Sequence, residues 1–303
     1  MLDLDFAFFN LINTDKRGFL YRKTVLDRLA PFLFAPRVKN LIDLPELKST
    51  GCNIVLPLGA GNLKILENEK QKDLFGRTAE ILDNKKIKIM AVDRSLKALF
   101  PQLSSGFFPV FGDNFIKALA FVMIRDILLR KDPKRLIIVG NTEDFGDLIE
   151  AISGYGLPIS IQNPHPEKYE VFAYHFLYKK GLAISNSRIK PENWEKDDLV
   201  LLLDYDMQEL AVTFPGVFFV RLSNKSRGLA RELEDSLAGC GIEPVLHNLA
   251  PILEAYLIDK AGFCGLNREL NMTNAGGDGN TFLSLQETGD RLNLWQLFLD
   301  KGI

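Results

Sequence analysis

Two glycines, Gly140 and Gly146, delimit the stretch of this sequence whose residue types best fit a chemical function. They follow a short β-branched run and precede a helical pattern, which is how a nucleotide-binding βαβ unit begins. Small residues in such a turn let backbone N–H groups and the start of the helix approach a pyrophosphate. We therefore expect a dinucleotide, NAD or NADP, to contact Gly140, Asn141, Thr142 and Gly146, with Asn163 at the end of the next strand.

The charges around this turn favour a second interpretation. The pattern G-x-G-x-x-G lacks its middle glycine here, and Glu143, Asp144 and Asp147 surround the phosphate position with no basic residue among them. At about 4 Å and an effective dielectric near 20, a like charge costs on the order of 4 kcal/mol, although acids also stabilise a helix start. The next strand ends in Gln162-Asn163-Pro164, with no acid there for an adenosine ribose. Either this region binds the dinucleotide, or it keeps the sheet without the ligand.

Two polar groups stand where α/β proteins place ligand contacts, outside the carboxyl ends of strands. Asp93 and Arg94 end one predicted strand, and Asp113 and Asn114 begin a predicted helix that also carries Lys117. A carboxylate beside a lysine can do acid–base work if both are desolvated and within hydrogen-bond reach. We expect Asp93, Asp113 and Lys117 to be catalytic, and Arg94 and Asn114 to bind substrate. The structural alternative is a strand-ending turn at Asp93 and a helix N-cap at Asp113 or Asn114.

His247 is a further candidate for substrate binding. It stands at the start of a helix predicted from residue 246 to about 261, so its imidazole could face an interdomain cleft, with capping or a surface position as the alternative. We expect no metal site. The cysteines are odd in number and widely spaced, and Asp204 and Asp206 have no further ligands nearby.

Apolar runs that alternate with helical patterns must position these residues. In the first half of the chain, strands are predicted at 52–58, 87–93 and 107–110, with helices at 63–83 and 114–130. In the second half, strands are predicted at 136–139, 158–162, 182–185, 199–204 and 217–222, with helices at 145–153, 167–179 and 226–238. Short apolar strands joined by helical crossovers predict a doubly wound parallel sheet.

The predicted fold class is therefore α/β. An N-terminal α/β domain of substrate-binding type is expected at 1–132, a Rossmann-like doubly wound parallel-sheet domain at 133–245, and a C-terminal helix that packs back, with a tail, at 246–303. Residues 1–47 are predicted as short helices, because apolar residues recur at helical spacing around Phe6, Phe9 and Ile12 and prolines interrupt the pattern. The glycine-rich stretch 274–280 is predicted as a flexible loop.

Composition limits the function classes. The chain has 303 residues, of which 47% are hydrophobic, which is enough for two cores, and its net charge of −2 gives no field for nucleic acid or anionic membrane. The apolar stretch 115–129 is interrupted by charges, and the N-terminus has no basic lead of a signal peptide. The scattered cysteines indicate a reducing cytoplasm. The expected partner is a small-molecule ligand, with a homo-oligomer left open and neither nucleic acid nor membrane.

Three stretches carry a resemblance to a known superfamily. Phe108-Pro109-Val110-Phe111-Gly112-Asp113-Asn114 looks like the substrate-side loop of the acyl carrier protein reductases. Residues 139–146 align with their glycine turn, with Glu143 at the middle glycine, and residues 249–255 look like their late helix. Over about residues 50 to 270 the order of parts resembles the superfamily of shikimate dehydrogenase, glutamyl-tRNA reductase and these reductases. The resemblance implies a substrate domain, a Rossmann domain and a late helix crossing back; the reductases' nucleophilic cysteine has no counterpart in that helix.

Two hypotheses about function follow. The leading one is a Rossmann-type NAD(P)-dependent oxidoreductase-like protein of unknown substrate, with a degenerate dinucleotide site. The alternative is a non-catalytic ligand-binding or protein-interaction protein that kept the fold and lost the cofactor. A third interpretation is a metabolite without phosphate in the same crevice, which would require a closed and mostly apolar pocket.

Overall fold

The computed structural model describes residues 4–12, 18, 22–97, 108–140, 145–203, 214–262 and 281–299. The chain forms two compact units: unit 1 comprises Met1–Phe115 and Ala230–Gly279, and unit 2 comprises Ile116–Leu229 and Asn280–Ile303. We expected three consecutive ranges, 1–132, 133–245 and 246–303, whereas each observed unit is made of two separate segments. The reason is that the helices after residue 230 pack on the sheet of unit 1 before the chain returns to unit 2.

Unit 1 is built on a five-stranded sheet, sheet A, in the order β2-β3-β1-β4-β5. Its strands are β1 (Phe6–Leu11), β2 (Arg37–Leu44), β3 (Ser49–Leu56), β4 (Ile89–Val92) and β5 (Phe108–Val110). All neighbouring pairs are parallel except β2 and β3, which are antiparallel. Its helical elements include α1 (Lys23–Leu33), η2 (Pro45–Leu47), α2 (Ala60–Ile65), α3 (Asn68–Lys85), α7 (Arg231–Gly239) and α8 (Leu246–Lys260).

The first strand corrects the sequence prediction for the N-terminal region. We expected short helices before residue 47, and α1 is one, but Phe6–Leu11 forms the middle strand of sheet A between β3 and β4. The residues Phe6, Ala7, Phe8 and Phe9 are consecutive and all fully buried. A parallel strand is covered on both faces and therefore reads as a continuous apolar run, which can imitate helical spacing by chance.

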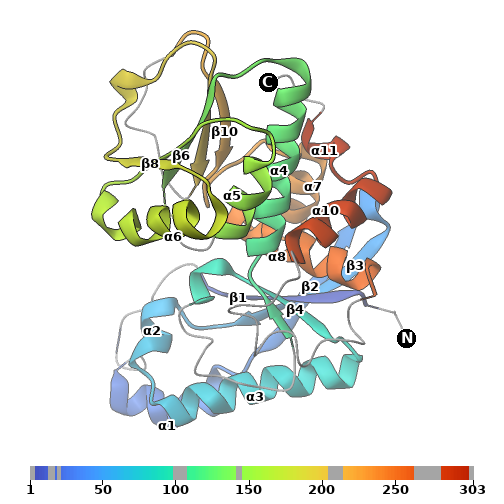
Figure 1. Ribbon diagram of the computed structural model, residues 1–303. Helices are drawn as coiled ribbons and strands as arrows, with labels where there is room; N and C mark the ends of the chain where they lie inside the picture. The colour runs from blue at the N-terminus through green and yellow to red at the C-terminus, as the bar shows by residue number, and fades with distance from the viewer. Residues whose placement is uncertain are drawn as a thin grey trace. The chain divides into compact units, whose positions relative to one another are not determined.

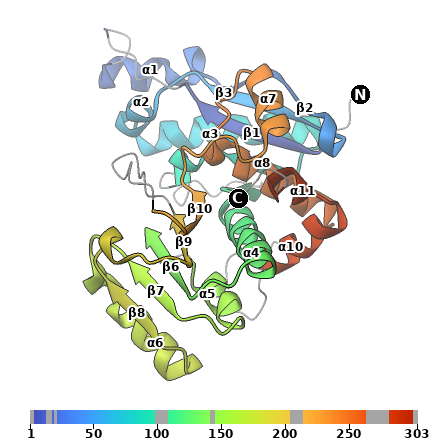
Figure 2. The ribbon, with the colours of Figure 1, turned by 90° about the horizontal axis from the view of Figure 1, so that it is seen from above.

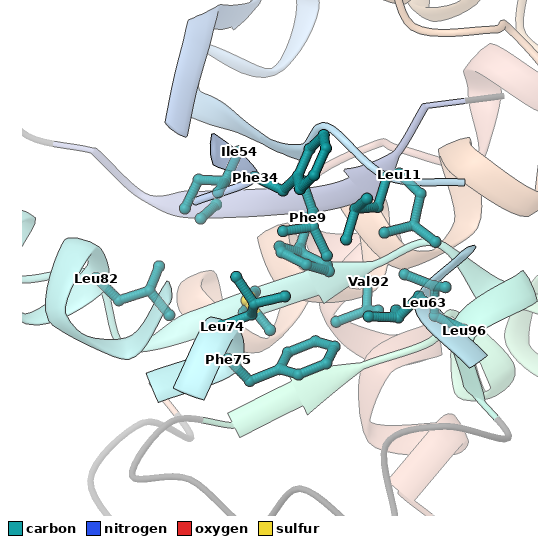
Figure 3. Close-up of a cluster of buried hydrophobic side chains, with 14 of the residues drawn as sticks. Phe9, Leu11, Phe34, Ile54, Leu63, Leu74, Phe75, Leu82, Val92 and Leu96 are labelled. Carbon is teal, nitrogen blue, oxygen red and sulfur yellow. The ribbon is translucent and has the colours of Figure 1, made fainter. Parts of the chain in front are cut away.

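Different helices cover the two faces of sheet A. The helices α1 and α3 lie along one face and α8 lies along the other (Figure 1). On the face covered by α1 and α3, Phe9, Ile54 and Phe75 belong to the buried cluster drawn in Figure 3, and the ring centroids of Phe9 and Phe75 are 5.5 Å apart. Burial of each such side chain contributes roughly 1.5–3 kcal/mol to folding. Side chains alternate along a strand, so Phe8, between Ala7 and Phe9 of this cluster, faces the α8 side.

Unit 2 is built on a second sheet, sheet B, in the order β10-β9-β6-β7-β8, with every neighbouring pair parallel. Its strands are β6 (Arg135–Gly140), β7 (Ile159–Gln162), β8 (Ile184–Ser187), β9 (Asp198–Leu203) and β10 (Phe218–Leu222). Counted along the chain, the strand order is 3-2-1-4-5, which is the order of a Rossmann domain without its sixth strand. Helical elements here include α5 (Gly146–Ser153), η5 (Pro166–Tyr169), α6 (Glu170–Lys180), η6 (Pro191–Asn193), α10 (Thr281–Arg291) and α11 (Gln296–Leu299).

The expected α/β fold class is confirmed, since parallel strands alternate with helices in both units and α8 packs back on β1 and β4. The helix α4 (Asp113–Arg130) carries the boundary between the units in its first turn. We took α8 as the last helix, which was wrong: α10 follows it, and its Phe282 packs on Phe121 of α4 with ring centroids 6.1 Å apart. The stretch 274–280 lies outside the described residues. Among the described helices, none is both long and apolar enough to cross a membrane.

Candidate functional site

The strand order of sheet B fixes where a ligand would bind in unit 2. From β6 the chain moves toward β7 and β8, and from β9 it moves toward β10 on the other side. In open parallel sheets, ligands bind in the crevice at such a switch point, outside the carboxyl ends of the two strands. The segments that follow β6 and β9, residues 141–144 and 204–213, lie outside the described residues. The predicted cofactor contacts at Asn141 and Thr142 belong to the first of these segments.

Gly140, the last residue of β6, is at this switch point and has no room for a side chain. Its φ is +119°, and a Cβ atom there would lie 1.8 Å from the carbonyl oxygen of Leu203 at the end of β9. A residue other than glycine would therefore have to separate the two central strands as well as adopt a strained backbone. The strand β6 ends at the residue where the sequence predicts the turn to begin, and close packing between β6 and β9 requires glycine at that position.

Gly146 has a less restrictive environment. It is the first residue of α5, and a Cβ atom there would lie 3.4 Å from the ring of Phe172, which is an ordinary packing distance. The residue before it, Phe145, has no side-chain group that caps the helix. The first backbone N–H groups of α5 therefore receive no capping bond from that side chain, and such groups suit an anion.

A lysine also stands beside the start of α5, although the sequence around the turn contains none. Lys117 of α4 places its Nζ 2.9 Å from Asp147 Oδ1 and 3.0 Å from Oδ2, and the lysine side chain is 12% exposed. Asp147 lies in the first turn of α5, where its Oδ1 also accepts the Leu148 N–H at 2.9 Å. One of the acids around the phosphate position is thus neutralised from another helix. We expected Lys117 to act with Asp113; the structure pairs it with Asp147.

Asn163, predicted to contact the cofactor, is buried just after β7 and its carboxamide bonds to the protein itself. Its Nδ2 donates to the Gly140 carbonyl at 2.7 Å and lies 3.3 Å from the hydroxyl of Tyr169, while its Oδ1 accepts the His165 N–H at 2.8 Å. These bonds join the ends of β6 and β7. The carboxamide holds the switch point in shape, in the place where a Rossmann enzyme commonly has an acid for the ribose.

In unit 1, the structure brings together two of the predicted residues with a third that the sequence did not single out. Arg94 donates from Nη1 to Asp113 Oδ1 at 2.9 Å and to the Phe111 carbonyl at 3.2 Å, and Lys97 Nζ lies 2.9 Å from Asp113 Oδ2. Burial raises the pKa of Asp113, but Arg94 and Lys97 outweigh it and the net pKa is lowered. Asp113 is therefore an ionised carboxylate that orients two cations.

Asp93 has the geometry of a strand-ending turn. Its N–H donates to the Phe9 carbonyl at 3.0 Å, which extends the pairing of β4 with β1 by one bond. Its Oδ1 accepts the Ser95 N–H at 2.8 Å, the local bond by which aspartate stabilises a turn. These two bonds fit the alternative in which Asp93 is a turn residue that ends the strand and has no catalytic role.

Asn114 points to a functional candidate that the sequence analysis missed, Glu254 of α8. Glu254 is 4% exposed; its Oε2 accepts the N–H groups of Asn114 and Phe115 at 3.0 and 3.2 Å, and its Oε1 accepts Asn114 Nδ2 at 3.3 Å. A side chain of α8 thus caps α4. Burial raises the pKa of Glu254 to about 7, with Asp113 adding to the rise and the hydrogen bonds opposing it. The signal available in the sequence was a lone acid within the apolar run 246–258.

His247, the last predicted substrate contact, lies half-buried in the first turn of α8. The N-terminal half of this helix approaches the residues that follow β5. At Gly112, where φ is +82°, a Cβ atom would lie 2.6 Å from the backbone nitrogen of Pro251. Glycine before α4 therefore lets α8 pack closely enough for Glu254 to reach the helix start.

Comparison with known proteins gives distant likenesses only. No protein-family model and no curated protein matches this chain. Among solved structures, it is similar to L-tryptophan dehydrogenase from Nostoc punctiforme, with a TM-score of 0.48 and 11% identity over 97% of this chain and 80% of that one. It is also similar to the leucine-bound hetero-hexameric glutamate dehydrogenase from Thermus thermophilus, with a TM-score of 0.38 and 14% identity over 98% of this chain and 82% of that one. Likenesses at these scores carry no argument about what this chain does.

Proposed function

We propose that the chain binds a nicotinamide dinucleotide, NAD or NADP, at the carboxyl end of β6 and acts as an oxidoreductase on a small molecule. The observation that supports this best is the strand order of sheet B, with Gly140 at the end of its first strand and packed against Leu203 at the switch point. Doubly wound sheets of this order bind dinucleotides at this place. We also propose, from the sequence resemblance, that the chain is related to the shikimate dehydrogenase superfamily.

The charges beside α5 fit the phosphate end of such a ligand. Gly140, Asn141, Thr142 and Gly146 would hold the pyrophosphate through backbone groups. Lys117 compensates Asp147, one of the three acids around the phosphate position, at 2.9 Å. A bound nicotinamide would accept or supply the hydride. The protein's share would be to position the ring and the substrate.

Substrate contacts are proposed in unit 1, around the ion pairs of Asp113. Arg94 donates there to Asp113 and to the Phe111 carbonyl, and the Lys97 side chain is 45% exposed, so its ammonium can be approached from solvent. These cations favour a substrate with a carboxylate or another anionic group. In this scheme Asn114 is a positioning residue, because its amide and side chain are bonded to Glu254. His247 and Asp93 remain proposed contacts.

A specific observation favours the second candidate function, a non-catalytic protein that kept the fold. At the end of β7, where the adenosine ribose would need a carboxylate, the structure has Asn163, whose carboxamide is bonded to Gly140 and Tyr169. The described residues thus suit the phosphate end of a dinucleotide and leave the ribose without an acid there. Weak binding or none is the expected consequence if no other group replaces that acid.

Calorimetric titration with NAD, NADH, NADP and NADPH separates the two candidates. The proposal predicts binding of at least one of them, weakened about tenfold in Lys117→Gln, which corresponds to about 1.4 kcal/mol. Lys180→Gln is the matched control, since Lys180 pairs with Glu150 at 2.7 Å elsewhere in unit 2. No heat with any nucleotide would support the non-catalytic candidate. Equal weakening in both variants would remove the role given to Lys117.

A further inference from the structure

Three buried asparagine oxygens in unit 1 accept no hydrogen bond. They are the Oδ1 atoms of Asn10, Asn53 and Asn248; the described residues contain one more such oxygen, that of Asn186 in unit 2. Asn53 and Asn248 are 1% and 5% exposed. A buried acceptor without a donor loses its bond to water and receives nothing in return. A group of such atoms in one region therefore suggests a species that binds there.

Asn10 and Asn53 share one face of sheet A. Phe8 is paired with Asn53 and Asn10 with Val55, so Asn10 and Asn53 are diagonal neighbours on adjacent parallel strands. The two side chains therefore project from neighbouring strands to the same side of the sheet. This is the face that α8 covers, opposite the cluster of Phe9 (Figure 1).

Asn248 lies in the first turn of α8, about as far from Lys260 along the helix as Asn10 lies from Asp5 along the strand. The far end of the helix is tied to the start of β1, with Lys260 Nζ 3.3 Å from Asp5 Oδ1. From Lys260 back to Asn248 the helix rises about 18 Å, and from Asp5 to Asn10 the strand rises about 17 Å. Because α8 packs on β1 and β4, these similar lengths bring the first turn of α8 to the level of the end of β1.

The hydrogen bonds fix which end of two carboxamides is unpaired. Asn53 Nδ2 donates to Asn40 Oδ1 at 3.1 Å, and Asn40 Nδ2 in turn donates to the Cys240 carbonyl at 2.7 Å. Asn248 Nδ2 donates to the Glu243 carbonyl at 2.9 Å. A flipped amide would place an oxygen against an oxygen in each case. The unpaired atoms are acceptors. The carbonyls of Cys240 and Glu243 belong to the segment that joins α7 to α8 (Figure 2).

We propose that unit 1 binds a monovalent cation, K⁺, Na⁺ or ammonium, between sheet A and the start of α8, through the side-chain oxygens of Asn10, Asn53 and Asn248. Neutral amide oxygens are suitable ligands for hard cations. A divalent ion would need more negative charge than this set provides, because buried charge must be compensated. Asp93 follows the pair of Phe9 and Val92 by one residue, so its backbone lies level with that of Asn10. The three asparagines that form this site have no part in the proposed dinucleotide function.

Calorimetric unfolding of the whole chain in different chloride salts at equal ionic strength tests the site. K⁺, Na⁺ or ammonium should raise the unfolding midpoint by at least about 3 °C relative to choline, since binding to the folded state alone stabilises it by mass action. Asn248→Leu should lose this increment. The matched control Asn186→Leu removes the unpaired oxygen of unit 2 and should keep it. An increment that is absent from the wild type, or equal in both variants, overturns the proposal.

A second measurement uses the wild-type protein and does not depend on the folding of a variant. Crystals grown with Rb⁺ in place of K⁺ should show an anomalous peak among the three Oδ1 atoms. Density without anomalous signal at that place would identify an ordered water and overturn the proposal. Water is the competing occupant because it also donates hydrogen bonds to buried acceptors.

Discussion

Removing the charge of Glu254 should change how the stability of unit 1 depends on pH. In the folded protein, burial raises the pKa of Glu254 from 4.5 to about 7. A carboxyl whose folded pKa is raised contributes stability that is fully present below its unfolded pKa and is lost as the pH rises through the folded one. The difference of roughly 2.5 pH units at about 1.4 kcal/mol each predicts a loss on the order of 3 kcal/mol between pH 4.5 and 7.5.

The variant Glu254→Gln isolates this effect. Its uncharged amide oxygen can still accept the N–H groups of Asn114 and Phe115, at a cost of about 1 kcal/mol for the less favourable bond to Asn114 Nδ2. Relative to wild type, the variant should be slightly less stable at pH 4.5 and more stable, by up to about 2 kcal/mol, at pH 8. Asp113 does not confuse the comparison, because its lowered pKa affects stability only in the more acidic range.

Urea unfolding followed by far-UV circular dichroism, at steps of pH from 4.5 to 8, is the suitable assay. Tryptophan fluorescence is not, because the chain's tryptophans, Trp194 and Trp295, both belong to unit 2. A stability difference between wild type and Glu254→Gln that stays constant across this range would show that Glu254 does not titrate with a raised pKa. A difference that changes in the opposite direction would show the same.

Two further predictions concern a glycine that has no space for a Cβ atom and a cysteine thiol that is buried away from water. Gly140→Ala should destabilise unit 2 by at least about 4 kcal/mol or abolish its folding, because the new Cβ would lie 1.8 Å from the Leu203 carbonyl oxygen. Gly146→Ala should stay within about 1 kcal/mol of wild type. Similar unfolding midpoints for the two variants, followed by tryptophan fluorescence, would contradict this. Burial raises the pKa of the Cys52 thiol to about 11, so in a chain with the remaining cysteines replaced by serine it should resist an aromatic disulfide reagent at pH 8 and react within seconds in urea. Full labelling of the folded chain would contradict that expectation.

The sequence predicted the strands of sheet B closely because fully buried parallel strands are apolar runs bounded by turns. It failed in the N-terminal region for two different physical reasons. β1 is apolar at every position but Asn10, so its period is hidden, and β2 carries Arg37, Lys39 and Asp43 because it is an edge strand with one face largely in solvent. The strand β1 lacks the alternation that identifies a half-buried strand, whereas β2 alternates in burial but Asn40 and Leu41 interrupt the alternation of residue types.

The candidate site was predictable only where local backbone geometry decides. Gly140 could be found because a tight turn after a buried strand needs glycine. The pairing of Lys117 with Asp147 could not, since thirty residues separate them and only the packing of α4 against α5 joins them. For Asn163 the position was predicted, but its use in holding β6 to β7 depends on hydrogen-bond partners that a linear pattern does not contain.

A crystal structure of the protein grown with saturating NADH and, separately, NADPH would locate the bound nucleotide. We expect a pyrophosphate at the carboxyl end of β6, against the backbone of residues 140–146 and within ion-pair distance of Lys117. A nucleotide bound anywhere else would contradict it. A map without nucleotide, together with calorimetry that detects no binding at the same nucleotide concentration, would also contradict it. That result would support the non-catalytic candidate, which keeps the fold and binds no cofactor.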